Sequence, residues 1–189
     1  MSYRLRLMRE DDCERVRQWR MLPEVTKYMY TDPQITPEQQ RAWFERIAVS
    51  DRDRVWIIES VDDAGTPAPI GVLSLSEIDP VNQRCAWAYY LGETSARGIG
   101  LAKSLELSVY AYVFDTLGLN KLWCEVFAFN DRVVALHEKF GSKVEGIARQ
   151  HIRKNGEWFD VVRMGILKSE WDATREKWTY TPIEIEHRA

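Results

Sequence analysis

A change of sequence pattern near residue 98 constrains the fold of this chain more than any other feature. Before it, residues 54–60, 70–78 and 84–91 have the length and apolar content of strands, and turn residues separate them. From residue 98 to residue 117, apolar residues recur at helical spacing instead, and Gly118 ends the segment. An antiparallel meander that leads into one long amphipathic helix predicts an α/β structure.

The segments on either side of this region complete the expected fold. Thr36, Pro37 and Gln39 form a capping-box pattern, which predicts the start of a helix. Asn155-Gly156 is a strong two-residue hairpin turn between two strands. The other expected elements are a strand at 3–8, helices at 10–21, 130–140 and from 169 onward, and strands at 121–127, 143–153 and 157–167.

This order of elements predicts one domain over residues 1–189. Its fold class is α/β (α+β), with a mixed, mostly antiparallel sheet of about seven strands flanked by helices. A length of 189 residues fits one such domain, and no repeat or linker divides it. The final helix carries Trp171 and Trp178. The tail at 178–189 is either an oligomer-forming strand, which would suit a homodimer, or a loose end.

Composition and charge exclude several classes of function. The 26 Lys and Arg residues against 29 Asp and Glu residues give a net charge of −3, so no general basic field attracts nucleic acid or an anionic membrane. Apolar runs fall far short of the ~20 residues of a membrane helix, and residues 1–6 lack the apolar core of a signal peptide. Three scattered Cys and only three His predict neither disulfides nor a metal site. We therefore expect a cytoplasmic, metal-free protein.

The main indication of chemistry is a glycine-containing loop before the long helix, Arg97-Gly98-Ile99-Gly100-Leu101-Ala102. At such a position, free backbone N–H groups and the positive end of the helix dipole form a site for a diphosphate. Gly98 and Gly100 allow the backbone to approach phosphate closely, and Arg97 can hold phosphate oxygens with two hydrogen bonds. The loop is neither a Walker loop nor a Rossmann fingerprint. By itself it also fits an ordinary strand-to-helix turn.

This loop resembles the pyrophosphate signature of the GNAT superfamily, acyltransferases that use acetyl-CoA. The signature is Arg/Gln-x-x-Gly-x-Gly/Ala, and Arg97, Gly100 and Ala102 match its fixed positions. Residues 130–141 are similar to the Asn…Ala…Glu-Lys-x-Gly-Phe helix of these enzymes, with the last two residues reversed. The resemblance covers nearly the whole chain and implies a GNAT fold. It implies acetyl-CoA as cosubstrate, held by Leu91, Gly92, Arg97, Gly98, Ile99, Gly100, Leu101, Ala102, Lys103, Asn130 and Lys139.

Three stretches are similar to a subgroup that acetylates a UDP-linked 4-amino sugar in pseudaminic acid biosynthesis. They are residues 19–44, the Glu-Val pair at 125–126 and the hairpin at 154–161. The same hairpin style occurs in enzymes that acetylate ribosomal-protein N-termini. The subgroup resemblance implies a nucleotide-sugar pocket lined by Arg20, Met29, Tyr30, Trp43, Tyr90 and Glu125.

Each of these side chains also has a simpler interpretation. Aromatic and Met faces can stack on a uracil ring, but Trp43 lies at helical spacing and equally fits a core position. Tyr89 and Tyr90 alternate along a strand, so only one of them faces the pocket. Glu125 is either a site carboxylate or a solvated residue at the end of a strand.

The resemblance implies direct attack of a neutral amine on the thioester in a ternary complex. The oxyanion would be stabilised by a backbone N–H near Leu91 or Gly92, and Glu125 would act as base through a water molecule. The amino-sugar enzymes use a Tyr to protonate the leaving thiolate, and His137 stands at that position. With an ordinary pKa near 6.5, about a quarter of His137 would be protonated at pH 7. It is either this acid or a half-buried helix residue.

Three functions follow from these motifs. The first is acetylation of an amine on a nucleotide-linked sugar. The second is acetylation of a protein N-terminus or a small free amine by an enzyme of the same fold. The third is a non-catalytic sensor of acyl-CoA or nucleotide.

Overall fold

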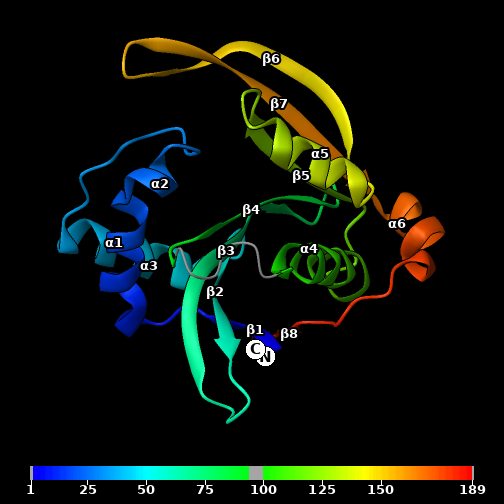
Figure 1. The fold of residues 1–189 in the computed structure, drawn as a ribbon, viewed down its shortest axis with the longest axis horizontal. Helices are drawn as coiled ribbons and strands as arrows, with labels where there is room; N and C mark the ends of the chain where they lie inside the picture. Colours follow the sequence, from blue (N-terminus) through cyan, green and yellow to red (C-terminus); the bar gives the residue numbers. More distant parts are fainter. Residues whose placement is uncertain (1, 94–99, 189) are drawn as a thin grey trace.

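The residues that the computed structural model describes, 2–93 and 100–188, form one mixed sheet of eight strands (Figure 1). In chain order the strands are β1 (Ser2–Leu7), β2 (Arg54–Val61), β3 (Pro67–Asp79), β4 (Arg84–Leu91), β5 (Lys121–Phe127), β6 (Lys143–Lys154), β7 (Glu157–Leu167) and β8 (Glu184–Ile185). Across the sheet their order is β6-β7-β5-β4-β3-β2-β1-β8. The pairs β4–β5 and β1–β8 are parallel and the other pairs are antiparallel, which confirms the expected mixed sheet.

Helices cover both faces of this sheet (Figure 1). On one side lie η1 (Glu10–Asp12), α1 (Cys13–Met21), α2 (Pro23–Thr26) and α3 (Pro37–Val49). On the other side lie α4 (Leu101–Ala111), the π-helical turn η3 (Tyr112–Thr116), α5 (Asp131–Lys139), α6 (Lys168–Thr174) and η4 (Arg175–Lys177).

Each face of the sheet has its own apolar core. Because side chains alternate along a strand, β4 directs Trp87 into the larger core with Leu105 of α4, and Tyr90 toward the smaller core around Trp19 of α1. Burial of such a side chain contributes about 1.5–3 kcal/mol relative to leaving it exposed. Apolar packing therefore stabilises the sheet on both faces, and β4 contributes side chains to both cores.

The local signals in the sequence are confirmed where they are strongest. The Oγ1 atom of Thr36 accepts a hydrogen bond from the Gln39 N–H at 3.2 Å, and Oε1 of Gln39 accepts one from the Thr36 N–H at 2.9 Å. Asn155 and Gly156 have φ angles of 52° and 86°, which the two-residue turn between β6 and β7 requires.

Several elements differ from the expectation. The long helix continues only to Ala111 as an α-helix and then widens into η3, and the last helix ends before Trp178. The tail is not a loose end, because β8 pairs with β1 of the same chain. Trp56 fixes it further, since its Nε1 donates to the Glu186 carbonyl at 2.8 Å. Within the described residues, every helix is too short or too polar to span a bilayer.

The two central parallel strands separate partway along their length. β4 and β5 pair only over their first three residues, from Arg84 with Lys121 to Ala86 with Trp123. Beyond this point β4 follows β3 as far as Leu91, whereas β5 follows β7. The facing edges of β4 and β5 therefore have no strand partner there, and their backbone polar groups are free to bind a ligand.

Candidate active site

The end of β4 distinguishes the two expected oxyanion donors. The Gly92 N–H donates to the Ile70 carbonyl of β3 at 3.0 Å, so it is already used within the sheet. Successive N–H groups of a strand point to opposite sides, so that of Leu91 is directed toward the space between β4 and β5. Of the two, Leu91 is the residue placed to donate to a ligand, and the expectation for Gly92 is corrected.

Gly92 has a packing role instead. A Cβ atom at this position would lie 2.1 Å from Cγ of Trp19, because the indole ring rests directly on the glycine. Nε1 of Trp19 also donates to Oε1 of Glu93 at 3.0 Å. The last residues of β4 are thus fixed by α1.

The glycine loop is described only in part. Arg97, Gly98 and Ile99 lie outside the described residues. Gly100 has φ of 75° at the N-cap of α4 and supplies no capping side chain, so the first-turn N–H groups of α4 are available to an anion. Leu101 is buried in the larger core, whereas Ala102 and Lys103 are half-buried.

The α5 residues expected to bind the cosubstrate lie at opposite ends of their helix. Asn130 is the N-cap, and its carbonyl accepts from Val133 and Val134 at 3.0 and 3.2 Å. Lys139 is the last residue, is exposed, and lies 5.9 Å from the centre of the Phe140 ring. The helix rises about 1.5 Å per residue, so the two residues are roughly 13 Å apart along its axis.

The structure brings together Tyr30 and Glu125, two of the expected substrate residues. The Tyr30 hydroxyl donates to Oε2 of Glu125 at 2.8 Å, and Nη2 of Arg163 lies 3.5 Å from Oε1. Burial first, and then the neighbouring carboxylate, raises the pKa of Tyr30, so the phenol stays protonated. Tyr30 therefore holds the Glu125 carboxylate in place, and the carboxylate can still accept a hydrogen bond from a further group.

Arg20, Tyr90 and Trp43, three other expected substrate residues, have contacts elsewhere. Arg20 donates to Oγ1 of Thr31 at 3.0 Å, and burial lowers its pKa. Tyr90, rather than Tyr89, faces the α1–α3 side. Trp43 packs against the smaller core, which agrees with the core interpretation.

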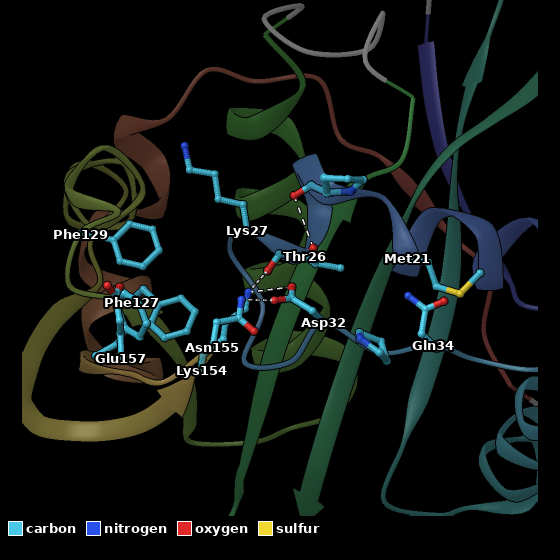
Figure 2. Close-up of a pocket in the computed structure, with 13 residues that line it drawn as sticks. Met21, Thr26, Lys27, Asp32, Gln34, Phe127, Phe129, Lys154, Asn155 and Glu157 are labelled. Atoms are coloured by element: carbon cyan, nitrogen blue, oxygen red, sulfur yellow. Dashed lines mark hydrogen bonds and ion pairs between the residues drawn. The ribbon is translucent and has the colours of Figure 1, made fainter.

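A cavity of about 650 Å³ opens next to the Tyr30–Glu125 pair. Figure 2 shows it between the segment from Met21 to Gln34 on one side and Phe127 and Phe129 on the other. The rings of Phe127 and Phe129 stack at 5.0 Å, and Phe159 meets Phe127 edge-on at 5.4 Å. Its lining consists of Met21, Pro23, Thr26, Lys27, Asp32, Pro33, Gln34, Phe127, Phe129, Lys154, Asn155, Glu157 and Phe159.

Lys154 lines this cavity and connects three other residues near it (Figure 2). Its ammonium group lies 2.9 Å from Oδ1 of Asp32 and donates to the carbonyls of Thr26 and Met29 at 2.6 and 3.0 Å. All three donors of the group are therefore used. None of the six expected substrate residues is part of this lining. Two of them lie next to it, since Tyr30 packs on Phe127 and the Met29 carbonyl accepts from Lys154.

His137 is fully buried, at 4% exposure, rather than half-buried. Its Nδ1 lies 2.9 Å from Oε1 of Glu106 on α4. Burial alone would lower the pKa of His137, but hydrogen bonding to Cys124 and Glu106 outweighs it and raises the pKa to about 10. The sequence had suggested a mostly neutral imidazole, and the structure indicates a cation.

Sequence reasoning missed the three phenylalanines, Lys154 and Glu106. Phe127 and Phe129 carry a signal that was available, because Phe127 is the last residue of the strand that bears Glu125 and Phe129 lies just beyond it. Across residues 2–93 and 100–188, His, Cys, Asp and Glu side chains form no group of three or more that could hold a metal ion.

The structure thus combines a parallel strand pair that separates midway with a helix between the two strands, α4, that begins at a glycine. The acetyltransferase (GNAT) domain family matches residues 3–143, and the chain belongs to this family. It is an acetyl-CoA-dependent N-acyltransferase.

Individual relatives have different substrates. The chain is 32% identical to a putative ribosomal N-acetyltransferase of Bacillus subtilis, over 56% of this chain and 57% of the relative. It is 23% identical to the spermidine N(1)-acetyltransferase of Escherichia coli, over 90% and 88%. The crystal structure of spermidine N-acetyltransferase from Vibrio cholerae in complex with CoA and spermine superposes with a TM-score of 0.81, at 22% identity, over 90% of this chain and 98% of that one. This last likeness shows that the fold is shared.

Proposed function

We propose that this enzyme acetylates a primary aliphatic amine on a small molecule, of which a polyamine is one example. The observation that carries the proposal is the position of Glu125. It lies on β5 between Trp123, where pairing with β4 ends, and Phe127, which lines the cavity, and all three alternate residues share one face of the strand. An amine in the cavity would thus meet a carboxylate beside the space proposed for the thioester.

The charges around the cavity favour an ammonium group over a phosphate. Lys154 has no free donor for a phosphate oxygen, because Asp32 and two carbonyls occupy it. The faces of Phe127 and Phe129 attract cations, and Glu125 and Glu157 add negative charge. Spermidine acetyltransferases among the relatives support the same class of substrate.

The proposed reaction uses this chain's groups in three positions. Glu125 takes a proton from the ammonium group, directly or through water, so that a neutral amine attacks the thioester carbon. The Leu91 N–H stabilises the oxyanion. When the carbon–sulfur bond breaks, the electron pair goes to sulfur, His137 supplies its proton, and the nitrogen loses a second proton to water as the amide forms. Expected cosubstrate contacts are the first turn of α4 and the free edge of β4.

A nucleotide-linked amino sugar is the second candidate substrate. The stacked Phe127 and Phe129 rings offer a flat apolar face to a base, and Lys27 lines the cavity with an exposed ammonium group. This candidate differs from the first by requiring a diphosphate contact.

Release of CoA thiol with a panel of amines tests the proposal. We expect turnover with spermidine, slower turnover with a dipeptide amide, and the least with a UDP-linked 4-amino sugar. Glu125→Gln should lower kcat/KM by about 10²–10⁴-fold, the usual contribution of a general base. Glu176→Gln, an exposed carboxylate of η4, is the matched control and should leave it unchanged. Binding of acetyl-CoA without turnover of any amine would contradict the proposal and favour a sensor.

A further inference from the structure

A buried polar cluster lies between α4, α5 and β5, within the larger apolar core. Glu106 and Tyr110 are 0% exposed, and His137 and Ser142 are 4% and 5% exposed. Oε1 of Glu106 accepts from the Tyr110 hydroxyl and meets Nδ1 of His137 at 2.9 Å. The Tyr110 hydroxyl also lies 2.9 Å from Oγ of Ser142.

A carboxylate at this depth requires a compensating charge. Taking an unpaired carboxylate out of water costs several kcal/mol, so such groups are paired or neutralised. Among the described residues the ion-pair partner of Glu106 is His137, and neither Lys nor Arg joins them. The cluster is therefore an imidazolium–carboxylate pair to which Tyr110 supplies a hydrogen bond.

This pair lies against the point where the central strands separate. The His137 ring meets the Trp87 ring edge-on, with centres 5.4 Å apart. Trp87 is the β4 residue directly after the last paired position, and Cys124, which also interacts with His137, is its counterpart on β5. His137 therefore lies beside the point where β4 and β5 separate.

We propose that Glu106 is a positioning residue for the transfer step: it binds Nδ1 of His137 and keeps the ring cationic, which leaves Nε2–H as the proton donor to the departing thiolate. This inference rests on the proposed function. As the carbon–sulfur bond breaks, Nε2 gives its proton to sulfur and the imidazole becomes neutral. The nitrogen gives up two protons in all, one to Glu125 before the attack and one to water as the amide forms. Solvent returns a proton to the ring and takes one from Glu125, so one proton is released for each amine acetylated.

The groups that face His137 agree with this role. Glu106 and Tyr110 face it from α4, Cys124 from β5 and Trp87 from β4. Glu106 is the one charged group among them. Since the pKa of His137 is raised to about 10, the ring carries a proton at neutral pH, so a proton is in place when the carbon–sulfur bond breaks.

The test uses Glu106→Gln, which keeps the shape of the side chain and removes its charge. Without the carboxylate, burial is opposed only by the contact with Cys124, so the pKa of His137 should fall from about 10. At pH 8 we expect kcat with the best amine to fall about tenfold for each unit by which the pKa of His137 drops below 8, and KM for acetyl-CoA to change little. The loss should be recovered as the pH is lowered toward 6.

Ser142→Ala is the matched control, because it removes a neutral hydrogen-bonding group from the same cluster. It should leave the pH profile of kcat at its wild-type position. A structural role for Glu106 predicts something else: less folded enzyme, with a profile of unchanged shape.

An NMR titration of the three histidines decides the case without any substrate. His151→Gln and His187→Gln assign the signals, and His137 of the wild-type protein should remain protonated beyond pH 9. Titration of His137 near pH 6.5 in the wild type, or an unshifted kcat profile in Glu106→Gln, would overturn the inference. Absence of turnover in the wild type would instead overturn the proposed function, and the titration would still be conclusive.

Discussion

At the scale of single residues, Gly92 shows how packing and catalysis share one strand end. The Trp19 indole occupies the space of a Cβ atom at position 92, and the next N–H inward, that of Leu91, points toward the proposed thioester. A side chain here would push Trp19 off the sheet and tilt the end of β4. The position of the Leu91 N–H therefore depends on the absence of a side chain at Gly92.

Gly92→Ala should therefore lower the free energy of unfolding by about 1–3 kcal/mol, the usual cost of overpacking, and reduce kcat further than stability alone explains. Denaturant titration and steady-state kinetics measure both effects. Gly146→Ala is the control, because a Cβ atom there meets nothing within 4 Å and the residue lies in β6. Equal losses of stability and kcat in the two variants would show that the Trp19 ring can move aside at little cost.

The sequence predicted some residue-level features of the site and not others. Tyr30 and Glu125 were expected in one pocket, and they are hydrogen-bonded. The partners of Lys154 are backbone carbonyls more than 120 residues away, and no pattern of residue types encodes such contacts. Glu106 lies between Leu105 and Leu107 on a buried helix, and a charge in that position is a signal that sequence reasoning could have used.

At the scale of elements, predictability follows the range of the interactions. The capping box of α3 and the β6–β7 turn depend on neighbours within a few residues, and both were foreseen. β8 has two residues and exists because β1 supplies its hydrogen bonds. The separation of β4 from β5 depends on the register between distant segments, and it cannot be predicted from strand lengths alone.

The cap of α3 gives a prediction at this scale. Thr36→Ala removes the acceptor for the Gln39 N–H and should cost about 1 kcal/mol of stability, because one first-turn donor loses its partner. Thermal unfolding measures the loss, and Thr181→Ala, at an exposed position of the tail, serves as control. Since α3 packs on the smaller core and not on the cavity, kcat should be unchanged. A fall in kcat would link α3 to the site.

At the scale of the whole molecule, the proposed cosubstrate site lies between two groups of strands. β4 belongs to the meander with β2 and β3, and β5 belongs to the group with β6 and β7. Among the described residues, strand pairing between the two groups is limited to three residues each of β4 and β5, and both groups pack on α4. A ligand between the strands would replace the missing backbone partners, so it should stabilise the molecule as a unit.

Acetyl-CoA at 100 times its Kd should contribute about 2.7 kcal/mol, which raises Tm by roughly 5–10 °C for a chain of this length. Gly100→Ala should reduce this increase, because an L side chain at φ of 75° alters the first turn of α4. Gly65→Ala is matched to it: its φ is 83°, a Cβ atom meets nothing within 4 Å at either position, and it lies in the β2–β3 turn. Both variants should lose similar stability without ligand, since the backbone strain is the same. Only Gly100→Ala should also lose part of the acetyl-CoA shift, and equal shifts in the two variants would remove the α4 N-terminus from the binding site.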